Sequence, residues 1–200
     1  MRVLGLAGSP RRGGNSETLL DRALAGAQDA GADVEKVVVS QLKMSGCRHC
    51  DGCARTGICV VQDDMQSLYP KLREMDALIV ASPMFFMAIT AQLKAVFDRC
   101  QCLWVAKYEL GQSFVPAGSP KRPGLFIALG GTRFKHLFDP SRTILKSIFA
   151  TLDVAYGPEL FYRGIDKKGD ILQHPTALDE AYAAGQRLVE GGRRKDERSA

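Results

Sequence analysis

The sequence lacks a long apolar run. No stretch approaches the roughly 18 apolar residues that a membrane-spanning helix needs, so we expect no association with a membrane. The apolar segment near the start, Val3–Ala7, is short, has no cleavage site behind it and leads into a glycine-containing turn. A secretory signal has a longer apolar core and such a site, so the start of the chain is not typical of one.

The excess of positive over negative charge is small as well. The chain of 200 residues has 27 Lys and Arg against 22 Asp and Glu, which leaves a formal net charge of +5. The basic residues are scattered, apart from Arg193-Arg194-Lys195 near the end. This distribution predicts no nucleic-acid partner, and residues 191–200 are expected to form a flexible, solvated tail.

Cysteine is concentrated rather than spread along the chain. Six cysteines are present, and four of them fall between residues 47 and 59. Disulfide scaffolds distribute their cysteines over a short secreted chain, whereas a tight cluster without a secretory signal indicates metal or redox chemistry. We therefore expect a cytoplasmic protein.

Short apolar segments alternate with segments of helical periodicity, which is typical of βαβ units. Strands are expected at residues 3–7, 34–39, 77–81, 125–129 and 154–162. Helices are expected around residues 16–30, 65–75, 93–100, 144–149 and 177–189, with a long polar connection at 107–123. The charges of Glu35 and Lys36 suit an edge strand. The pattern predicts one α/β domain over residues 1–190, with a doubly wound, five-stranded parallel sheet.

Ligands of such sheets bind beyond the carboxyl ends of the strands, which places the loops 8–16, 82–89 and 130–140 at one edge. The first loop reads Gly8-Ser9-Pro10-Arg11-Arg12-Gly13-Gly14-Asn15-Ser16 and leads directly into a helix. The free N–H groups and the dipole of a helix N-terminus attract phosphate. The hydroxyl and amide side chains of this loop add neutral donors.

This first loop matches neither of the common nucleotide motifs. Gly14 stands where a Walker A motif needs Lys, and the spacing of a dinucleotide GxGxxG fingerprint is absent. The loop suits a phosphate monoester. The alternative is an ordinary strand-to-helix turn in which Ser16 caps the helix.

The other two loops are suited to a flat ligand. The second loop, Ser82-Pro83-Met84-Phe85-Phe86-Met87-Ala88, has four large apolar residues. They could cover an aromatic ring; the alternative is that Phe85 and Phe86 pack under a neighbouring element or at a subunit interface. The third loop begins with Gly130-Gly131, which either lets the backbone approach a ring edge or forms a plain turn.

The clustered cysteines follow the pattern Cys47-x2-Cys50-x2-Cys53-x5-Cys59. Three thiols at this short spacing resemble ferredoxin ligand runs, and the fourth could complete a [4Fe–4S] site. A four-thiolate zinc site and a loop without metal remain alternatives. Arg48, His49 and Arg55 lie among the thiols, where positive charge would favour thiolates and raise a cluster potential.

Several motifs together resemble those of the NADPH-dependent FMN reductases. They are Gly8-Ser9-Pro10-Arg11…Gly14-Asn15-Ser16, Cys50…Cys53…Gly57…Cys59, Asp63-Asp64-Met65, Ser82-Pro83…Phe85-Phe86 and Ala91-Gln92-Leu93-Lys94…Phe97-Asp98-Arg99. The complete four-cysteine cluster is similar to that of the iron–sulfur flavoproteins of this family. The resemblance covers roughly residues 1–135 and thins in the last third of the chain.

The resemblance implies a flavodoxin-like fold with strand order 2-1-3-4-5, FMN as cofactor and a homodimer or homotetramer. It implies that the FMN phosphate is held by Ser9, Arg11, Asn15, Ser16 and Thr18. The isoalloxazine would be flanked by Pro83, Met84, Phe85 and Phe86, with Gly130 and Gly131 on its far side. The chain departs from the family at two positions, with Phe85 where the family often has Tyr and Met87 where it often has Gly.

The function expected from these features is an FMN-dependent oxidoreductase. NAD(P)H or a reduced ferredoxin would be the donor, and a quinone, free flavin or oxygen the acceptor, with a [4Fe–4S] cluster as a possible relay. Because a flavin carries the difficult chemistry, no acid–base pair is required; His136 and His174 are expected to be structural or surface residues. The alternatives are an iron–sulfur flavoprotein that carries electrons without its own substrate, and a cysteine-based redox sensor.

Overall fold

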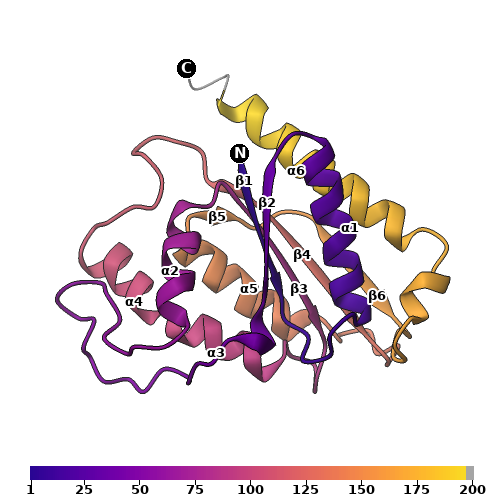
Figure 1. The fold of residues 1–200 in the computed structure, drawn as a ribbon, viewed down its shortest axis with the longest axis horizontal. Coiled ribbons are helices and arrows are strands. Elements are labelled where there is room, and N and C mark those ends of the chain that lie inside the picture. Colours follow the sequence, from indigo (N-terminus) through magenta and orange to yellow (C-terminus); the bar gives the residue numbers. More distant parts are fainter. Residues whose placement is uncertain (197–200) are drawn as a thin grey trace.

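The computed structural model describes residues 1–196 as alternating strands and helices (Figure 1). The strands are β1 (Arg2–Ala7), β2 (Asp33–Val38), β3 (Ala77–Pro83), β4 (Arg122–Gly130), β5 (Val154–Ala155) and β6 (Glu159–Arg163). The main helices are α1 (Asn15–Asp29), α2 (Met65–Glu74), α3 (Ala91–Arg99), α5 (Asp139–Thr151) and α6 (Ala177–Asp196). Shorter helical turns are η1 (Val39–Gln41), α4 (Gln101–Trp104), the π-helical η2 (Val105–Glu109) and η3 (Asp170–Gln173).

The sheet has the order β2-β1-β3-β4-β5, and all its pairings are parallel. This is the flavodoxin-like order, and it confirms the prediction. The expected fifth strand, 154–162, is divided: β5 pairs with the start of β4, and β6 pairs with its later half. Pro158 has no N–H for the ladder, and a Cβ at Gly157 would lie 2.2 Å from the carbonyl oxygen of Gly124. The chain therefore leaves and rejoins the sheet at this point.

Helices cover both faces of the sheet, with α1 and α6 on one side and α2, α3 and α5 on the other (Figure 1). Residues of the central strands alternate between the two cores; in β3, Leu78 faces one and Ile79 the other. Burial on both faces explains why these strands are apolar throughout. Strand β2 is partly exposed along its length, as expected for the edge. None of the helices within residues 1–196 is long and apolar enough to cross a membrane.

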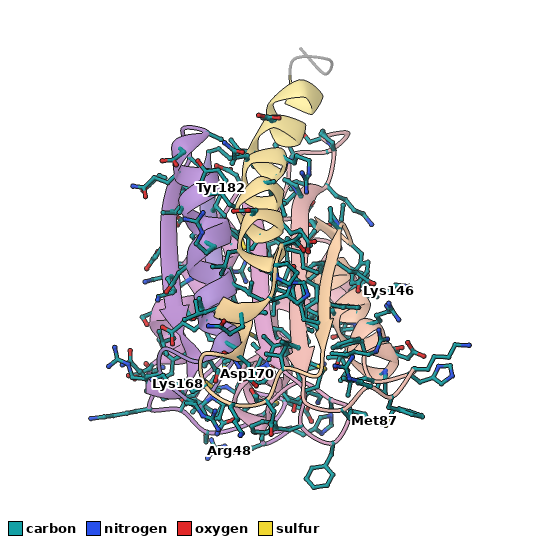
Figure 2. All side chains as sticks on the ribbon, turned by 90° about the vertical axis from the view of Figure 1, so that its right-hand side faces the viewer. Arg48, Met87, Lys146, Lys168, Asp170 and Tyr182 are labelled. Atoms are coloured by element: carbon teal, nitrogen blue, oxygen red, sulfur yellow. The ribbon has the colours of Figure 1, made fainter. Side chains whose placement is uncertain are left out.

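Helix α6 packs on α1 so closely that glycines replace side chains at the points where the two backbones meet. A Cβ at Gly185 would lie 1.8 Å from the carbonyl oxygen of Ala23, and one at Gly26 would lie 2.0 Å from that of Tyr182. Figure 2 shows Tyr182 on the side of α6 next to α1, and its hydroxyl donates to Asp29 at 2.6 Å. The backbones of the two helices are thus in direct contact.

Helix α6 also continues to Asp196, beyond its expected end at Val189. Gly192 lies so close to the start of the chain that a Cβ there would meet the side chain of Met1 at 2.8 Å. Gly192 thus lies against the start of the chain. The last part of the expected tail, 197–200, lies outside the described residues.

We expect Gly185→Ala to lower the free energy of unfolding by about 1–3 kcal/mol, because an added methyl in a close contact forces the helices apart. The matched control is Gly191→Ala on the same helix, where a Cβ meets nothing within 4 Å. It should be neutral or raise the stability by up to about 1 kcal/mol, since Ala favours helix over Gly. Urea unfolding followed by circular dichroism measures both, and equal values would contradict the close helix contact.

Candidate functional site

The three predicted loops meet at the carboxyl ends of the strands and line a shallow cavity of about 150 Å³. Its lining includes the predicted residues Ser9, Arg11, Asn15, Ser16, Pro83, Met84, Phe85, Gly130 and Gly131. Thr18 and Phe86 are not part of the lining. Figure 2 shows Met87, from the loop after β3, and Lys168 and Asp170, from the loop after β6, at the same lower end of the molecule.

The first loop is shaped by hydrogen bonds within the protein. The Ser9 hydroxyl accepts from Arg11 N at 3.0 Å, and Gly13 N donates to Glu17 at 2.7 Å. Glu17 is buried and also accepts from Lys36 at 2.9 Å. Burial by itself raises the pKa of Glu17, but the hydrogen bonds from Lys36 and Gly13 hold that pKa below its ordinary value. A charged Glu17 therefore fixes the loop from beneath.

The N-terminus of α1 is open toward the cavity. The N-cap is Gly14, with no side-chain cap bond, so the expectation that Ser16 caps the helix as an ordinary turn is wrong. The first N–H groups of a helix have no partner within it. Ser16 is buried and lines the cavity, and its hydroxyl makes no hydrogen bond to the described part of the chain. An anion placed here would meet free backbone donors, a free hydroxyl and the positive end of the helix dipole.

The side chains of Asn15 and Thr18 make hydrogen bonds to backbone groups of the protein. Asn15 donates from Nδ2 to the carbonyl of Lys167 at 2.8 Å and accepts from Gly169 N at 2.8 Å. The Thr18 hydroxyl donates to the carbonyl of Gly14 at 3.2 Å. Asn15 therefore ties the loop after β6 to the start of α1, and the Thr18 side chain stays within its own helix.

The loop after β6 is a part of the site that the sequence analysis missed. Ile165 and Asp166 line the cavity together with the three predicted loops. Asp170 shapes this loop by accepting from the backbone N–H groups of Asp166 at 3.1 Å and Lys167 at 2.8 Å. The signal was available, because this loop follows the fifth strand and so ends at the same edge.

The second loop forms a tight hairpin turn. Phe85 and Ala88 exchange backbone hydrogen bonds of 2.8 and 3.0 Å, and the two central residues have positive φ, 49° at Phe86 and 65° at Met87. Such a turn favours Asn and Gly, and left-handed backbone costs other residues about 1–2 kcal/mol each. Met84 is buried, whereas the Phe86 side chain is fully exposed. The alternative that Phe85 and Phe86 pack under a neighbouring element does not hold for Phe86 within this chain.

The glycines of the third loop pack closely against their surroundings. A Cβ at Gly130 would lie 3.0 Å from the side chain of Leu137, and one at Gly131 would lie 3.0 Å from that of Asp166. The carbonyl of Gly130 accepts from Ile165 N at 3.2 Å. Larger residues would push this backbone out of the cavity wall.

The cysteine loop, residues 44–62, forms a second candidate site. Cys47, Cys50, Cys53 and Cys59 line one small cavity of about 30 Å³, and none is in a disulfide. Cys47 and Cys50 are exposed and the other two are partly buried. Within residues 1–196, no three Cys, His, Asp or Glu side chains converge as a metal site. The donor set suits a metal centre, but the exposed thiols would have to move inward to form one.

A buried ion pair supports this loop, and sequence reasoning did not identify it. Arg99 lies behind the thiols, pairs with Asp63 through two hydrogen bonds of 2.5 and 3.0 Å, and contacts Cys59 Sγ at 3.5 Å. Burial raises the pKa of the Cys59 thiol, but hydrogen bonds, including that from Arg99, leave the pKa below its ordinary value. Burial and the neighbouring thiols raise the pKa of Cys53.

The basic residues within the cysteine loop are not buried beside the thiols as Arg99 is. Arg48 and His49 line the cavity but are exposed, and Arg55 is not part of the lining. A buried arginine is hard to recognise in a sequence, because its residue type is mostly exposed. The available signal was an Arg at the end of an apolar helix together with an Asp after the cysteines.

A larger cavity, of about 610 Å³, lies at the opposite end of the sheet and is lined by none of the predicted residues. The guanidinium of its buried Arg122 donates to the carbonyl oxygens of Leu72 at 3.0 Å and Arg73 at 2.6 Å. These bonds close the C-terminal end of α2. Since no predicted residue lines this cavity, the carboxyl edge of the sheet remains the candidate site.

Relatives of this chain are found among flavoproteins. An iron–sulfur flavoprotein of Methanosarcina thermophila is 34% identical over 133 residues, which are 66% of this chain and 65% of that protein. An iron–sulfur flavoprotein of Archaeoglobus fulgidus is 42% identical over 99 residues, which are 50% of this chain and 45% of that protein. The aligned part thus spans about half to two thirds of the length of these relatives.

Among solved structures, an NAD(P)H:quinone oxidoreductase from Methanothermobacter marburgensis superposes with a TM-score of 0.70 at 18% identity, over 94% of this chain and 96% of that one. At this identity the likeness shows the fold alone. The family profile described as NADPH-dependent FMN reductase matches residues 1–157. The chain belongs to the NADPH-dependent FMN reductase family.

Proposed function

We propose that this protein binds FMN at the carboxyl edge of its sheet and is an oxidoreductase that takes electrons from NAD(P)H or a reduced ferredoxin. The acceptor would be a small molecule such as a quinone, free flavin or oxygen. The observation that carries this proposal is the unpartnered hydroxyl of buried Ser16 at the open N-terminus of α1. It lies in a cavity lined by four loops of a chain that belongs to an FMN reductase family.

The phosphate end of FMN would be held by the first turn of α1. The free N–H groups of this turn and the Ser16 hydroxyl are donors, and the exposed Arg11 supplies charge. Ser9 and Asn15 act one step further away, because Ser9 shapes the turn and Asn15 fastens the neighbouring loop. Gly14 gives the backbone room, since a Cβ there would come within 3.0 Å of the Arg11 carbonyl.

The ring end of FMN would lie at the edge of the cavity. A volume of about 150 Å³ is below the roughly 300 Å³ of pockets that enclose a small ligand. The ring would therefore rest against Pro83, Phe85 and the backbone of Gly130 and Gly131, with one side accessible. FMN, when bound, supplies reversible electron uptake; the residues of this edge orient it and leave room for donor and acceptor.

The exposed aromatic side chains at this edge support a homodimer or homotetramer. Phe85 is half exposed and Phe86 is fully exposed, and a second copy placed over them would exclude water from the ring.

We also propose a cytoplasmic location, because several accessible thiols without a disulfide suit a reducing compartment.

The cysteine loop favours a second function, that of an electron carrier. We propose that Cys47, Cys50, Cys53 and Cys59 hold a [4Fe–4S] cluster, because all four line one cavity and the similar flavoproteins are named for iron and sulfur. A cluster would exchange single electrons with a protein partner. Anaerobic reduction by ferredoxin, but not by NADPH, would select the carrier over the reductase.

Protein purified without oxygen is expected to be yellow, or to turn yellow after incubation with FMN and desalting. It should then oxidise NADPH or NADH in the presence of a quinone, FMN or oxygen. Absorption spectra and steady-state rates measure both properties. Protein that stays colourless in excess FMN would contradict the proposal.

Ser16→Ala is expected to weaken FMN binding by about tenfold or more, since a hydrogen bond to a charged group contributes about 1.5–3 kcal/mol. Thr18→Ala is the matched control, because the Thr18 hydroxyl already bonds the Gly14 carbonyl. It should change the affinity by less than about threefold. Fluorescence titration of FMN measures both, and equal losses would argue against a direct role for Ser16.

Phe86→Gly is expected to separate stability from binding. The variant relieves a left-handed backbone without losing buried area, so the free energy of unfolding should stay the same or rise by about 1 kcal/mol. FMN affinity should fall several-fold, because we propose that the ring extends beyond the cavity lining as far as Phe86. Tyr108→Ala, at an exposed aromatic away from the cavity lining, is the control and should leave FMN binding unchanged. A Phe86 variant with normal affinity would remove this residue from the site.

A further inference from the structure

Arg99, at the end of α3, is one of the most buried side chains described, with 1% of its side chain exposed. A guanidinium has five N–H donors. Nη1 donates to Asp63 Oδ2 at 2.5 Å and to the carbonyl of Ser45 at 3.0 Å. Nη2 donates to Asp63 Oδ1 at 3.0 Å and to Cys59 Sγ at 3.5 Å. The fifth donor, Nε–H, is buried and has no acceptor among the described residues.

These bonds place Arg99 at the centre of the cysteine loop. Ser45 precedes the first thiol and Asp63 follows the last one, so a single guanidinium joins both ends of the loop to α3. Arg99 and the four cysteines of the loop line the same cavity. The Tyr69 hydroxyl donates to the carbonyl of Arg99 at 3.0 Å, which holds the end of the helix in place.

A centre with four thiolate ligands has a need that this arrangement meets. Four thiolates around a zinc ion or an oxidised iron–sulfur cubane leave a net negative charge, and such charge is costly near a protein interior without a nearby cation. Arg99 is that cation, and it keeps one donor unused. Asp63 orients the guanidinium. Its own charge is negative, like that of the centre, so the two repel each other.

We infer that Arg99 is the positioning residue of a four-thiolate metal centre, which it stabilises through its buried charge and its unused Nε–H. Asp63 holds Arg99 in place. This inference rests on the proposed metal centre and does not depend on the flavin. The two members of the ion pair then have opposite electrostatic effects on the centre, whereas two merely structural residues would have similar ones.

The experiment compares Arg99→Gln and Asp63→Asn in the full chain purified without oxygen. If the protein contains iron, the midpoint potential of its cluster is measured by redox titration followed by electron paramagnetic resonance. Loss of a positive charge should lower this potential, and loss of a negative charge should raise it, because reduction adds an electron to the centre. Arg99→Lys keeps the charge and should stay near the wild-type potential, with poorer metal retention because it lacks the planar fork.

If the protein contains zinc instead, zinc affinity is measured by competition with a chelating dye. Arg99→Gln should weaken it by about tenfold or more, and Asp63→Asn should weaken it less. Arg55→Gln is the control in both cases. It removes an exposed charge from the same loop, where solvent and salt screen its effect, so the change should be small.

Opposite potential shifts, or the predicted order of zinc affinities, support the role of Arg99. Shifts of the same sign, equal losses of zinc affinity, or effects no larger than those of Arg55→Gln overturn it. Wild-type protein that holds neither iron nor zinc after reconstitution overturns this inference and the metal centre together. FMN titration of the same samples tests the flavin site separately, so the two failures are distinguishable.

Discussion

All strands of the sheet run in one direction, and this constraint organises the rest of the molecule. The loops that follow β1, β3, β4 and β6 therefore end at one edge, although they are far apart in the sequence. Hydrogen bonds then join neighbouring loops. Gly8 N donates to the carbonyl of Ala81 at 2.8 Å, the Thr90 hydroxyl donates to the carbonyl of Gly8, and Asn15 fastens the loop after β6. The cavity is built by the scaffold before a ligand arrives, which reduces the ordering cost of binding.

The two candidate sites differ in how their charged groups are arranged. At the sheet edge, the donors at the start of α1 are neutral, and Glu17 is neutralised by Lys36 beneath the loop. An anion can therefore bind without breaking an existing ion pair. In the cysteine loop, the charge is a buried Arg99–Asp63 pair with 1% and 13% of the side chains exposed. Such a pair contributes little net stability, but the bonds of Arg99 to Ser45 and Asp63 join both ends of the loop to α3.

The turn at Phe86 and Met87 accepts an unfavourable backbone at the edge of the cavity. Its position beside the proposed binding surface fits the general observation that strained residues persist at functional sites. The stability lost here is small beside the two cores that cover the sheet, in which side chains such as Phe126 and Phe149 are almost completely buried. Close packing of α1 on α6 supports the same sheet from one face, so the edge can remain irregular without loosening the fold.

The sequence by itself determined the order of elements, the doubly wound sheet and the positions of the three predicted loops, because strand and helix periods are local and glycine marks turns. It also determined that four thiols lie within a short loop. Only the tertiary structure decided that Asn15 bonds to Lys167 and Gly169, that the fifth strand is divided at Gly157, and that Arg99 lies behind the cysteines. Each of these depends on contacts between residues distant in the chain, or on how closely two backbones approach. Local patterns can hint at such positions, but they do not determine which distant residues come into contact.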